Sequence, residues 1–161
     1  MLTEFKKQTG RTAYNQAYTY GMKYSFDGFN YLIRLDKGDK LGESLRQFAA
    51  QTKIEGAWVN GLGGALQAEL GFYDLDKKEY HWQQFDGLRE LVSLTGNLAY
   101  DQDGTFVYHL HAVLADNQYQ TIGGHVKDLT AAATIELFIH RAYQPTKRTM
   151  NASVGLQLLD V

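Results

Sequence analysis

The chain of 161 residues is 44% hydrophobic and 21% charged, which is typical of one globular domain and excludes an intrinsically disordered chain. Its 16 basic and 18 acidic side chains leave a net charge of −2, so the strongly basic balance usual in nucleic-acid binders is not expected. Cysteine is absent, which excludes disulfides, thiolate metal ligands and a cysteine nucleophile, and which fits a cytoplasmic protein.

Residues 1–17 show no hydrophobic periodicity and are predicted to be a flexible leader, followed by a single domain over residues 18–161. The first 25 residues carry four basic side chains and one acidic one, a net charge of +3, so the remainder carries −5. Such a leader could contact phosphate or remain a solvated tail, and both interpretations stay open. It lacks the apolar region of a signal peptide, and no apolar run approaches the roughly 18 residues of a membrane span, so no membrane association is expected.

A hairpin followed by a helix is predicted next. Alternation of aromatic residues with small or polar ones predicts a strand over residues 18–26, and a second strand is predicted over residues 31–35 after the turn signal Asp27-Gly28. Asp39 is the predicted N-cap of a helix that ends at about residue 53, because the apolar residues of this segment fall on one helical stripe. We interpret this stripe as a core-facing surface.

Further short strands are predicted through the middle and the end of the chain. The run Gly61-Leu62-Gly63-Gly64 is followed by no Lys-Ser or Lys-Thr pair, so a bulge or a tight packing corner is favoured over a phosphate loop. Residues 130–142 combine a helix-favouring alanine run with strand-like alternation. The predicted strands cover residues 57–60, 66–73, 79–85, 88–100 and 153–159, with turns at residues 74–78 and 86–87.

Three of the five histidines lie within 17 residues. His109 and His111 are two apart in a strand-like run, so both imidazoles are expected on one face. His125 lies in a second strand-like run, residues 119–126. A three-residue connection would pair His125 with His109 on the same face, and a two-residue connection would turn it to the other face. A bulge at Gly123-Gly124 could also restore the shared face.

Three neutral imidazoles on one face suit zinc or another divalent transition metal and leave one coordination position open. We therefore predict a metal site at His109, His111 and His125, with the outer ring nitrogens bonded to carbonyls or carboxylates. Because ligand imidazoles must be neutral, occupancy is expected to fall below about pH 6. Histidine pairs of this spacing also occur on strands without metal, so spacing alone leaves a structural role open.

The same residues carry a resemblance to a known family, the PPC or "plants and prokaryotes conserved" domain. The matching segments run from about Tyr31 to Ile139 and cover most of the chain. Their order makes the resemblance specific. The segments are Arg34-Leu35 with Gly38-Asp39, residues 57–64 (AWVNGLGG), residues 70–74 (LGFYD), residues 90–97 (ELVSLTGN), residues 109–114 with 123–126 (HLHAVL and GGHV), and Ile135-Glu136-Leu137.

The resemblance implies a homotrimer with a site near the subunit boundaries, and it assigns the second half of residues 130–142 to a strand. Together with the predicted elements it leads to an α+β fold, a mostly antiparallel β-sheet with one helix after the first hairpin. In plants the domain follows an AT-hook, an Arg-Gly-Arg-Pro motif. This chain has only Gly10-Arg11 without a following proline, so direct DNA binding is expected to be weak or indirect.

Two functions remain open. The first is a homotrimeric metal-binding assembly module, similar to candidate DNA-binding or transcription-associated proteins. The second is a small metal-dependent hydrolase or lyase of unknown substrate. For the second, the resemblance points to Glu90 as the acid/base residue, although a surface salt bridge would equally explain it. Arg34 and Asn97 are predicted ligand or interface residues, and Arg34 could pair with Glu90 or hold an anion. A closed metal sphere would favour the first function, and an open position within reach of Glu90 the second.

Overall fold

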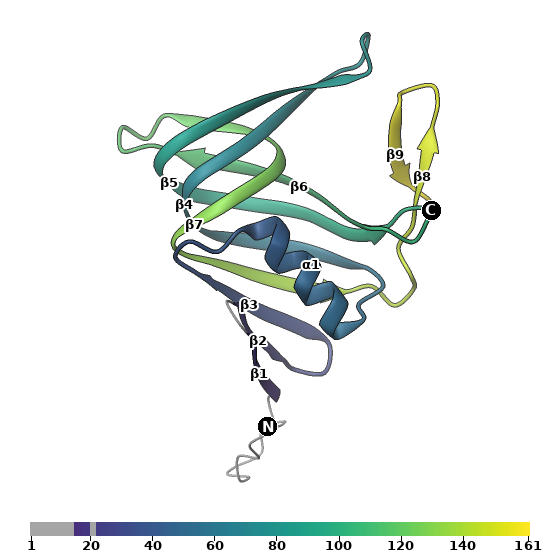
Figure 1. The fold of residues 1–161 in the computed structure, drawn as a ribbon, viewed down its shortest axis with the longest axis horizontal. Helices are drawn as coiled ribbons and strands as arrows, with labels where there is room; N and C mark the ends of the chain where they lie inside the picture. Colours follow the sequence, from purple (N-terminus) through teal and green to yellow (C-terminus); the bar gives the residue numbers. More distant parts are fainter. Residues whose placement is uncertain (1–14, 20–21) are drawn as a thin grey trace.

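The structure is a computed structural model in which residues 15–19 and 22–161 are described (Figure 1). Most of the predicted leader, residues 1–14, lies outside the described residues, and the first strand begins at Asn15. The described elements are β1 (Asn15–Thr19), β2 (Met22–Phe26), β3 (Asn30–Asp36), α1 (Leu41–Thr52), β4 (Ala57–Asp74), β5 (Glu79–Tyr100), β6 (Phe106–Ala115), β7 (Thr121–Arg141), β8 (Arg148–Asn151) and β9 (Leu156–Leu159).

Seven strands form one sheet in the order β1-β2-β3-β7-β4-β5-β6, and every neighbouring pair in it is antiparallel. β7 also pairs with β6, so the four strands from β4 to β7 close into a ring. β8 and β9 form a separate hairpin at the C-terminal end of the described chain (Figure 1). The predicted antiparallel sheet with one helix after the first hairpin is therefore confirmed.

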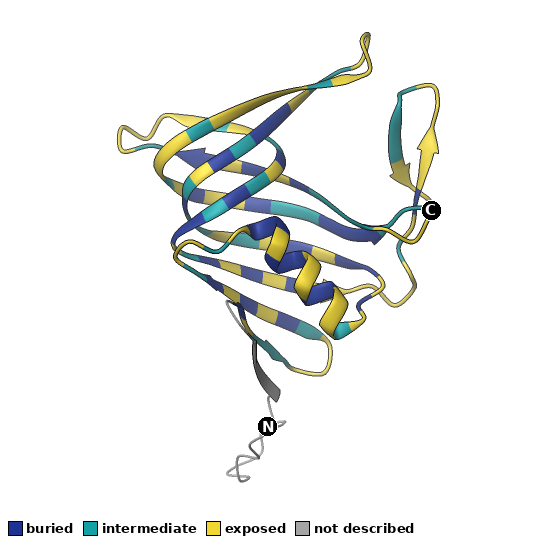
Figure 2. Ribbon diagram, in the orientation of Figure 1, coloured by how far each residue is buried: buried dark blue, intermediate teal, exposed yellow. Residues whose placement is uncertain are grey.

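The helix α1 packs on one face of the sheet and buries its apolar stripe there. Leu41, Leu45 and Phe48 are at most 1% exposed. The ring of Phe48 meets Tyr31 of β3 edge to face, with centroids 4.9 Å apart, and full burial of such a side chain contributes about 1.5–3 kcal/mol. Buried and exposed residues alternate along β3 (Figure 2), because successive strand side chains point to opposite faces. Across the described residues, no helix is both long and apolar enough to span a membrane.

The N-terminus of α1 is capped differently from the prediction. The N-cap residue is Lys40, whose side chain makes no capping bond. The carboxylate of Asp39 instead accepts a hydrogen bond from the backbone N–H of Asp36. Asp128 of β7 takes over the capping role, since its Oδ1 accepts a hydrogen bond from the backbone N–H of Gly42 at 2.9 Å. The prediction was wrong because the acceptor comes from a strand 86 residues further along the chain.

Several predicted short strands are parts of longer ones. β4 has 18 residues and β5 has 22, and each spans two of the predicted strands. The predicted turn at Asp86-Gly87 lies inside β5, where the register with β4 shifts between Ala65 and Gln67. Gly87 has φ of +92°. It is therefore the left-handed residue of a bulge within β5, and Asp86-Gly87 does not form a turn between two strands.

The glycine run of β4 forms the bulge that was predicted for it. The register with β5 shifts between Gly61 and Gly63. Gly63 has φ of +145°, and a Cβ there would lie 2.3 Å from the carbonyl oxygen of Thr134 on β7. Only glycine permits this approach of the two backbones.

Other boundaries also differ from the predictions. Residues 18–26 are not one strand, because β1 and β2 are antiparallel partners. Residues 153–159 hold a turn and β9, which pairs with β8. The ambiguous segment 130–142 continues β7 as far as Arg141. Ala131 and Ala132 are buried within the sheet, so tertiary packing outweighs the helix preference of alanine.

Candidate metal centre

The three clustered histidines lie on the sheet face opposite α1. Along β6 the residues Leu110 and Ala112 are buried toward the core, so His109 and His111 point to the other face. His125 lies on β7, where it pairs with His111 on one side and with Gly71 of β4 on the other. The site therefore lies where β7 closes the ring of strands.

The connection between β6 and β7 brings His125 to the predicted face, but in a different register. It spans residues 116–120, five residues and not three, and pairs His111 with His125. Because five and three are both odd, the face is preserved. No register shift interrupts this pairing, so a bulge at Gly123-Gly124 is not needed. The carboxylate of Asp116 holds the turn by accepting bonds from the backbone N–H groups of Gln118 and Gln120.

The distances in this cluster suit one metal ion. Nε2 of His109 lies 3.2 Å from Nε2 of His111. One nitrogen from each of the three rings can be chosen so that all lie within 4.8 Å of one another. Two nitrogens bound to the same zinc ion at about 2.0–2.1 Å in tetrahedral geometry lie about 3.3–3.4 Å apart. The His109–His111 separation is close to this value and the third nitrogen is within 4.8 Å, so the residues present fit the ion.

Two of the three clustered histidines have pKa values well below the ordinary histidine value. The pKa of His109 is lowered to about 4, first by burial and then by the positive charge of Arg148. The pKa of His125 is likewise lowered to about 4 by burial and by the neighbouring histidines and Arg148. Both rings are therefore neutral at pH 7, which is the charge state that metal binding requires. The predicted loss of metal below about pH 6 used the ordinary histidine pKa and stays a prediction.

An aromatic wall covers one side of the cluster. The ring of Tyr80 lies 4.8 Å from that of His125, and its hydroxyl oxygen lies 3.4 Å from Nδ1 of the same histidine. Trp82 stacks on Tyr80 with centroids 4.6 Å apart. The wall depends on Gly71, because a Cβ there would lie 2.6 Å from the Trp82 ring. Sequence reasoning missed this wall, although the alternation in EYHWQQF places both aromatic residues on one strand face.

Arg148, the first residue of β8, was also missed. It is 5% exposed, and its guanidinium lies 2.8 Å from Nδ1 of His109 and donates to Oδ1 of Asn97 at 2.9 Å. The outer nitrogens of His109 and His125 therefore meet a guanidinium and a hydroxyl, not the predicted carbonyls or carboxylates. Arg148 lies in a basic segment after Pro145, and nothing in this local sequence indicates that its side chain reaches the histidines.

The other predicted site residues divide into one that reaches the cluster and two that do not. Asn97 is 8% exposed, pairs with His109 across β5 and β6, and joins the cluster through Arg148. Glu90 is exposed and pairs with Ala115 at the far end of β6. Within the described part of the chain, no hydrogen bond or ion pair links Glu90 to the histidines.

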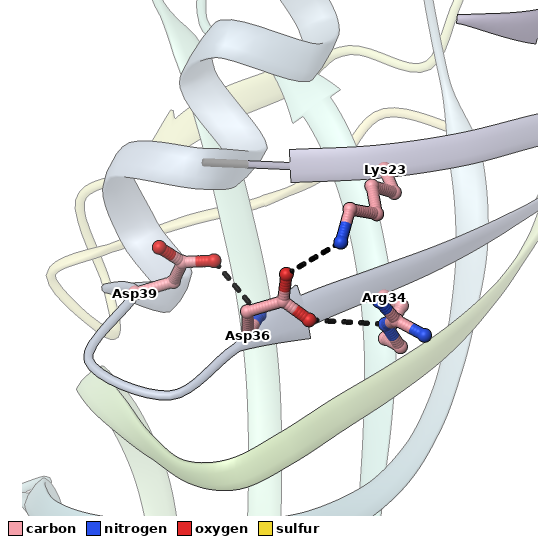
Figure 3. Close-up of polar contacts among 4 residues, drawn as sticks. All are labelled: Lys23, Arg34, Asp36 and Asp39. Atoms are coloured by element: carbon pink, nitrogen blue, oxygen red, sulfur yellow. Dashed lines mark hydrogen bonds and ion pairs between the residues drawn. The ribbon is translucent and has the colours of Figure 1, made fainter. Parts of the chain in front are cut away.

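Arg34 lies on β3, away from the histidines. Its Nε bonds to Asp36 at 3.0 Å, and Lys23 bonds to the same carboxylate at 2.9 Å (Figure 3). The four-residue close-up also shows Asp39 bonded to the backbone of Asp36. These ion pairs are about half exposed and contribute little to stability. Arg34 does not pair with Glu90.

A comparison with known protein families finds one family whose sequence pattern matches most of the chain. Residues 22–142 match the Plants and Prokaryotes Conserved (PCC) domain, which is the PPC domain of the sequence resemblance. The chain belongs to this family. The PCC match ends before β8, so Arg148 lies outside the matched residues.

Solved structures share the fold of this PCC domain. A candidate DNA-binding protein from Ralstonia eutropha JMP134 has a TM-score of 0.80 and 27% identity, covering 86% of this chain and 95% of that one. A metal-containing protein from Archaeoglobus fulgidus has a TM-score of 0.76 and 27% identity, covering 83% of this chain and 94% of that one.

A curated relative matches only in part. The bifunctional protein GlmU of Synechococcus sp. (strain JA-3-3Ab) is 32% identical over 98 residues, which are 60% of this chain. The match spans 14% of that protein's length.

Proposed function

We propose that this PCC domain binds one divalent transition metal ion, zinc being the best match, through His109, His111 and His125. The convergence of three ring nitrogens within 4.8 Å carries this proposal. Neutral imidazoles are preferred zinc ligands, and three of them leave one position for a further ligand. The metal-containing relative from Archaeoglobus fulgidus supports the same conclusion.

The proposed biological role is that of a homotrimeric assembly module. The sheet face that carries the histidines also exposes large apolar side chains, which a single subunit leaves in water. Next to them lies a hollow of about 730 Å³ whose lining includes Arg34, Leu62 and Phe138. Neighbouring copies that cover this face would give Arg34 an interface role. The exposed apolar residues on this face are Leu32 (56%), Trp58 (51%), Leu62 (55%) and Phe138 (42%).

A small metal-dependent hydrolase or lyase is the second candidate. His111 is exposed and borders a cleft of about 240 Å³ that also includes Ser93, Thr95 and Val113. Bound at the histidines, the metal would supply Lewis-acid chemistry to a ligand in this cleft. The cleft is smaller than the about 300–1,000 Å³ of most ligand pockets, and Glu90 would have to come from another subunit. We therefore favour the assembly module.

Elemental analysis of protein purified without a histidine tag tests the metal site. We expect about one equivalent of zinc or a similar metal per chain. His111→Ala should lose the metal and keep the circular dichroism spectrum of the fold. His140→Ala is the matched control, since His140 bonds to Asn30 away from the cluster, and it should keep the metal. A wild-type protein that takes up no divalent ion at micromolar concentration would overturn the proposal.

A further inference from the structure

The C-terminal hairpin delivers a buried positive charge to the histidine cluster. Arg148 is 5% exposed and donates from Nη1 to the carbonyl oxygen of Gln157 at 2.7 Å. Nη2 donates to Asn97 and lies 2.8 Å from Nδ1 of His109. These partners are all uncharged, and the ion pairs of the described residues do not include Arg148. Its Nε is buried without a partner among the described atoms. The charge therefore stays uncompensated beside the proposed cation site.

The contact also determines where the hydrogen of His109 lies. A guanidinium can only donate hydrogen bonds, so Nδ1 of His109 must accept this one. In the neutral ring the hydrogen is then on Nε2, and this nitrogen faces Nε2 of His111 at 3.2 Å. A metal ion needs the lone pair of this Nε2. Metal-binding histidines usually donate their other N–H to an acceptor, whereas His109 meets a donor.

The same hairpin is held at its other end by the long β4–β5 hairpin. The hydroxyl of Tyr73 donates to the carbonyl oxygen of Val154 at 2.7 Å, and Nζ of Lys78 donates to the carbonyl oxygen of Ala152 at 2.8 Å. Both acceptors lie in the turn between β8 and β9, while the ring of Tyr73 also packs on Tyr80 with centroids 4.8 Å apart. The hairpin thus spans from the metal site to the tip of the sheet.

We propose that Arg148 is a positioning residue that closes the three-histidine site against metal, so that docking of the β8–β9 hairpin and metal binding oppose each other. The inference rests on the proposed metal function. Metal at His109 moves the ring hydrogen to Nδ1 and removes the acceptor that holds Arg148. Repulsion between the two cations adds to this effect. Because binding free energies are reciprocal, metal loosens the hairpin by the same factor by which the docked hairpin weakens the metal.

Zinc titration against a chromophoric chelator tests the competition on the full chain. Arg148→Gln removes the charge and should bind Zn²⁺ at least about tenfold more tightly than the wild type, as expected when a cation is removed from beside another. Lys147→Gln removes the same charge from an exposed neighbour and should change the affinity by less than about twofold, as for a screened surface charge. Tyr73→Phe keeps the ring that packs on Tyr80 and removes only the hydroxyl that holds the far end of the hairpin, and it should also tighten binding if Arg148→Gln fails to fold.

Hydrogen exchange of residues 148–159 supplies a second measurement. Zinc should accelerate exchange in the wild-type hairpin and have no effect in Arg148→Gln. Equal or weaker zinc binding by Arg148→Gln, or slower hairpin exchange with zinc, would overturn the inference while leaving the metal site intact. If neither the wild type nor Arg148→Gln binds zinc, both the proposed metal binding and the inference about Arg148 are overturned.

Discussion

The carboxylate of Asp128 on β7 accepts a hydrogen bond from the backbone N–H of Gly42 and so ties the N-terminus of α1 to the sheet. The same oxygen accepts a bond from the backbone N–H of Leu129. The first N–H groups of a helix have no partners within the helix. A negative charge near them also interacts favourably with the positive end of the helix dipole. One strand side chain therefore replaces the local N-cap that Lys40 does not provide.

Asp128→Ala is expected to lower the free energy of unfolding by about 1–2 kcal/mol, the usual cost of a lost cap. Urea unfolding followed by circular dichroism measures this change. Asp103→Ala, in an exposed turn, is the matched control and should stay within about 0.5 kcal/mol of the wild type. Equal effects of the two substitutions would show that the contact does not cap the helix.

Metal-free protein is expected to lose stability as the pH falls from about 6.5 toward about 4. In the folded chain the pKa of His109 and that of His125 are each lowered to about 4, whereas unfolded histidines have a pKa of about 6.5. Between these values the unfolded chain binds more protons, so protons favour unfolding. Above pH 7 both states are neutral at these positions and the effect vanishes.

Urea midpoints at pH 7.5 and pH 5 in the presence of a chelator measure this effect. Carboxylates also titrate at the acidic end, so the variant His109→Gln/His125→Gln provides the comparison and should lose less stability between the two values. His140→Gln should keep the wild-type dependence. Identical pH dependence in all three proteins would show that the two clustered histidines are not the cause.

Gly96→Ala is expected to disrupt the histidine cluster from the neighbouring strand. A Cβ at Gly96 would lie 1.9 Å from the carbonyl oxygen of His109, and φ at this position is +154°. Strands β5 and β6 would have to separate between the two histidines of β6. We expect a loss of about 1–3 kcal/mol of stability and of metal binding, measured by urea unfolding and zinc titration.

Gly104→Ala separates this clash from the cost of backbone strain alone. Gly104 has φ of +76°, but its Cβ would meet nothing within 4 Å. This variant should be destabilised and still bind zinc. A Gly96→Ala protein with wild-type zinc affinity would contradict the proposed clash.

Phe138→Asp is expected to dissociate the proposed trimer. Phe138 is 42% exposed on the face with the apolar patch, and a carboxylate there would have to be desolvated in any interface. Light scattering should give three times 18.2 kDa for the wild type and 18.2 kDa for the variant. Phe72→Asp changes a residue that is 73% exposed outside the patch and should remain trimeric. A monomeric wild type at micromolar concentration would refute the assembly proposal.

Duplex DNA is expected to bind weakly, above micromolar concentration at physiological salt. The net charge is −2, and affinity for phosphates needs clustered basic side chains. Fluorescence anisotropy over a range of salt concentrations tests this expectation. Removal of residues 1–17 shows whether their basic side chains carry any remaining affinity. Submicromolar binding by the wild type would contradict the charge argument.

The parts of the fold that follow from local patterns were predictable. The helix stripe through Phe48 and the shared face of His109 and His111 depend only on helical and strand periods. An odd number of residues in the connection was enough to place His125 on the same sheet face as the other two histidines. Its pairing partner depended on how Asp116 shapes a five-residue connection. The bulge at Gly87 was mistaken for a turn because both conformations use Asp-Gly.

The parts that depend on distant contacts were not predictable. Asp128 caps α1, and Arg148 reaches His109 across 39 residues of sequence. Glu90 was selected by resemblance, but the sheet register places it opposite Ala115 at the far end of β6. The position of such residues is determined by sheet closure and by the C-terminal hairpin, not by any local pattern.

All three histidines belong to a single hairpin, β6–β7, and this has a consequence for the order of events during synthesis. Contacts between residues so close in sequence cost little chain entropy and form early. Arg148 follows His125 by 23 positions. At about 5–20 residues per second, His125 is synthesised roughly one to five seconds before Arg148. Under the proposed competition with Arg148, a metal ion present in that interval would meet ligands that no guanidinium yet opposes, and the nascent chain would be loaded more easily than the finished protein.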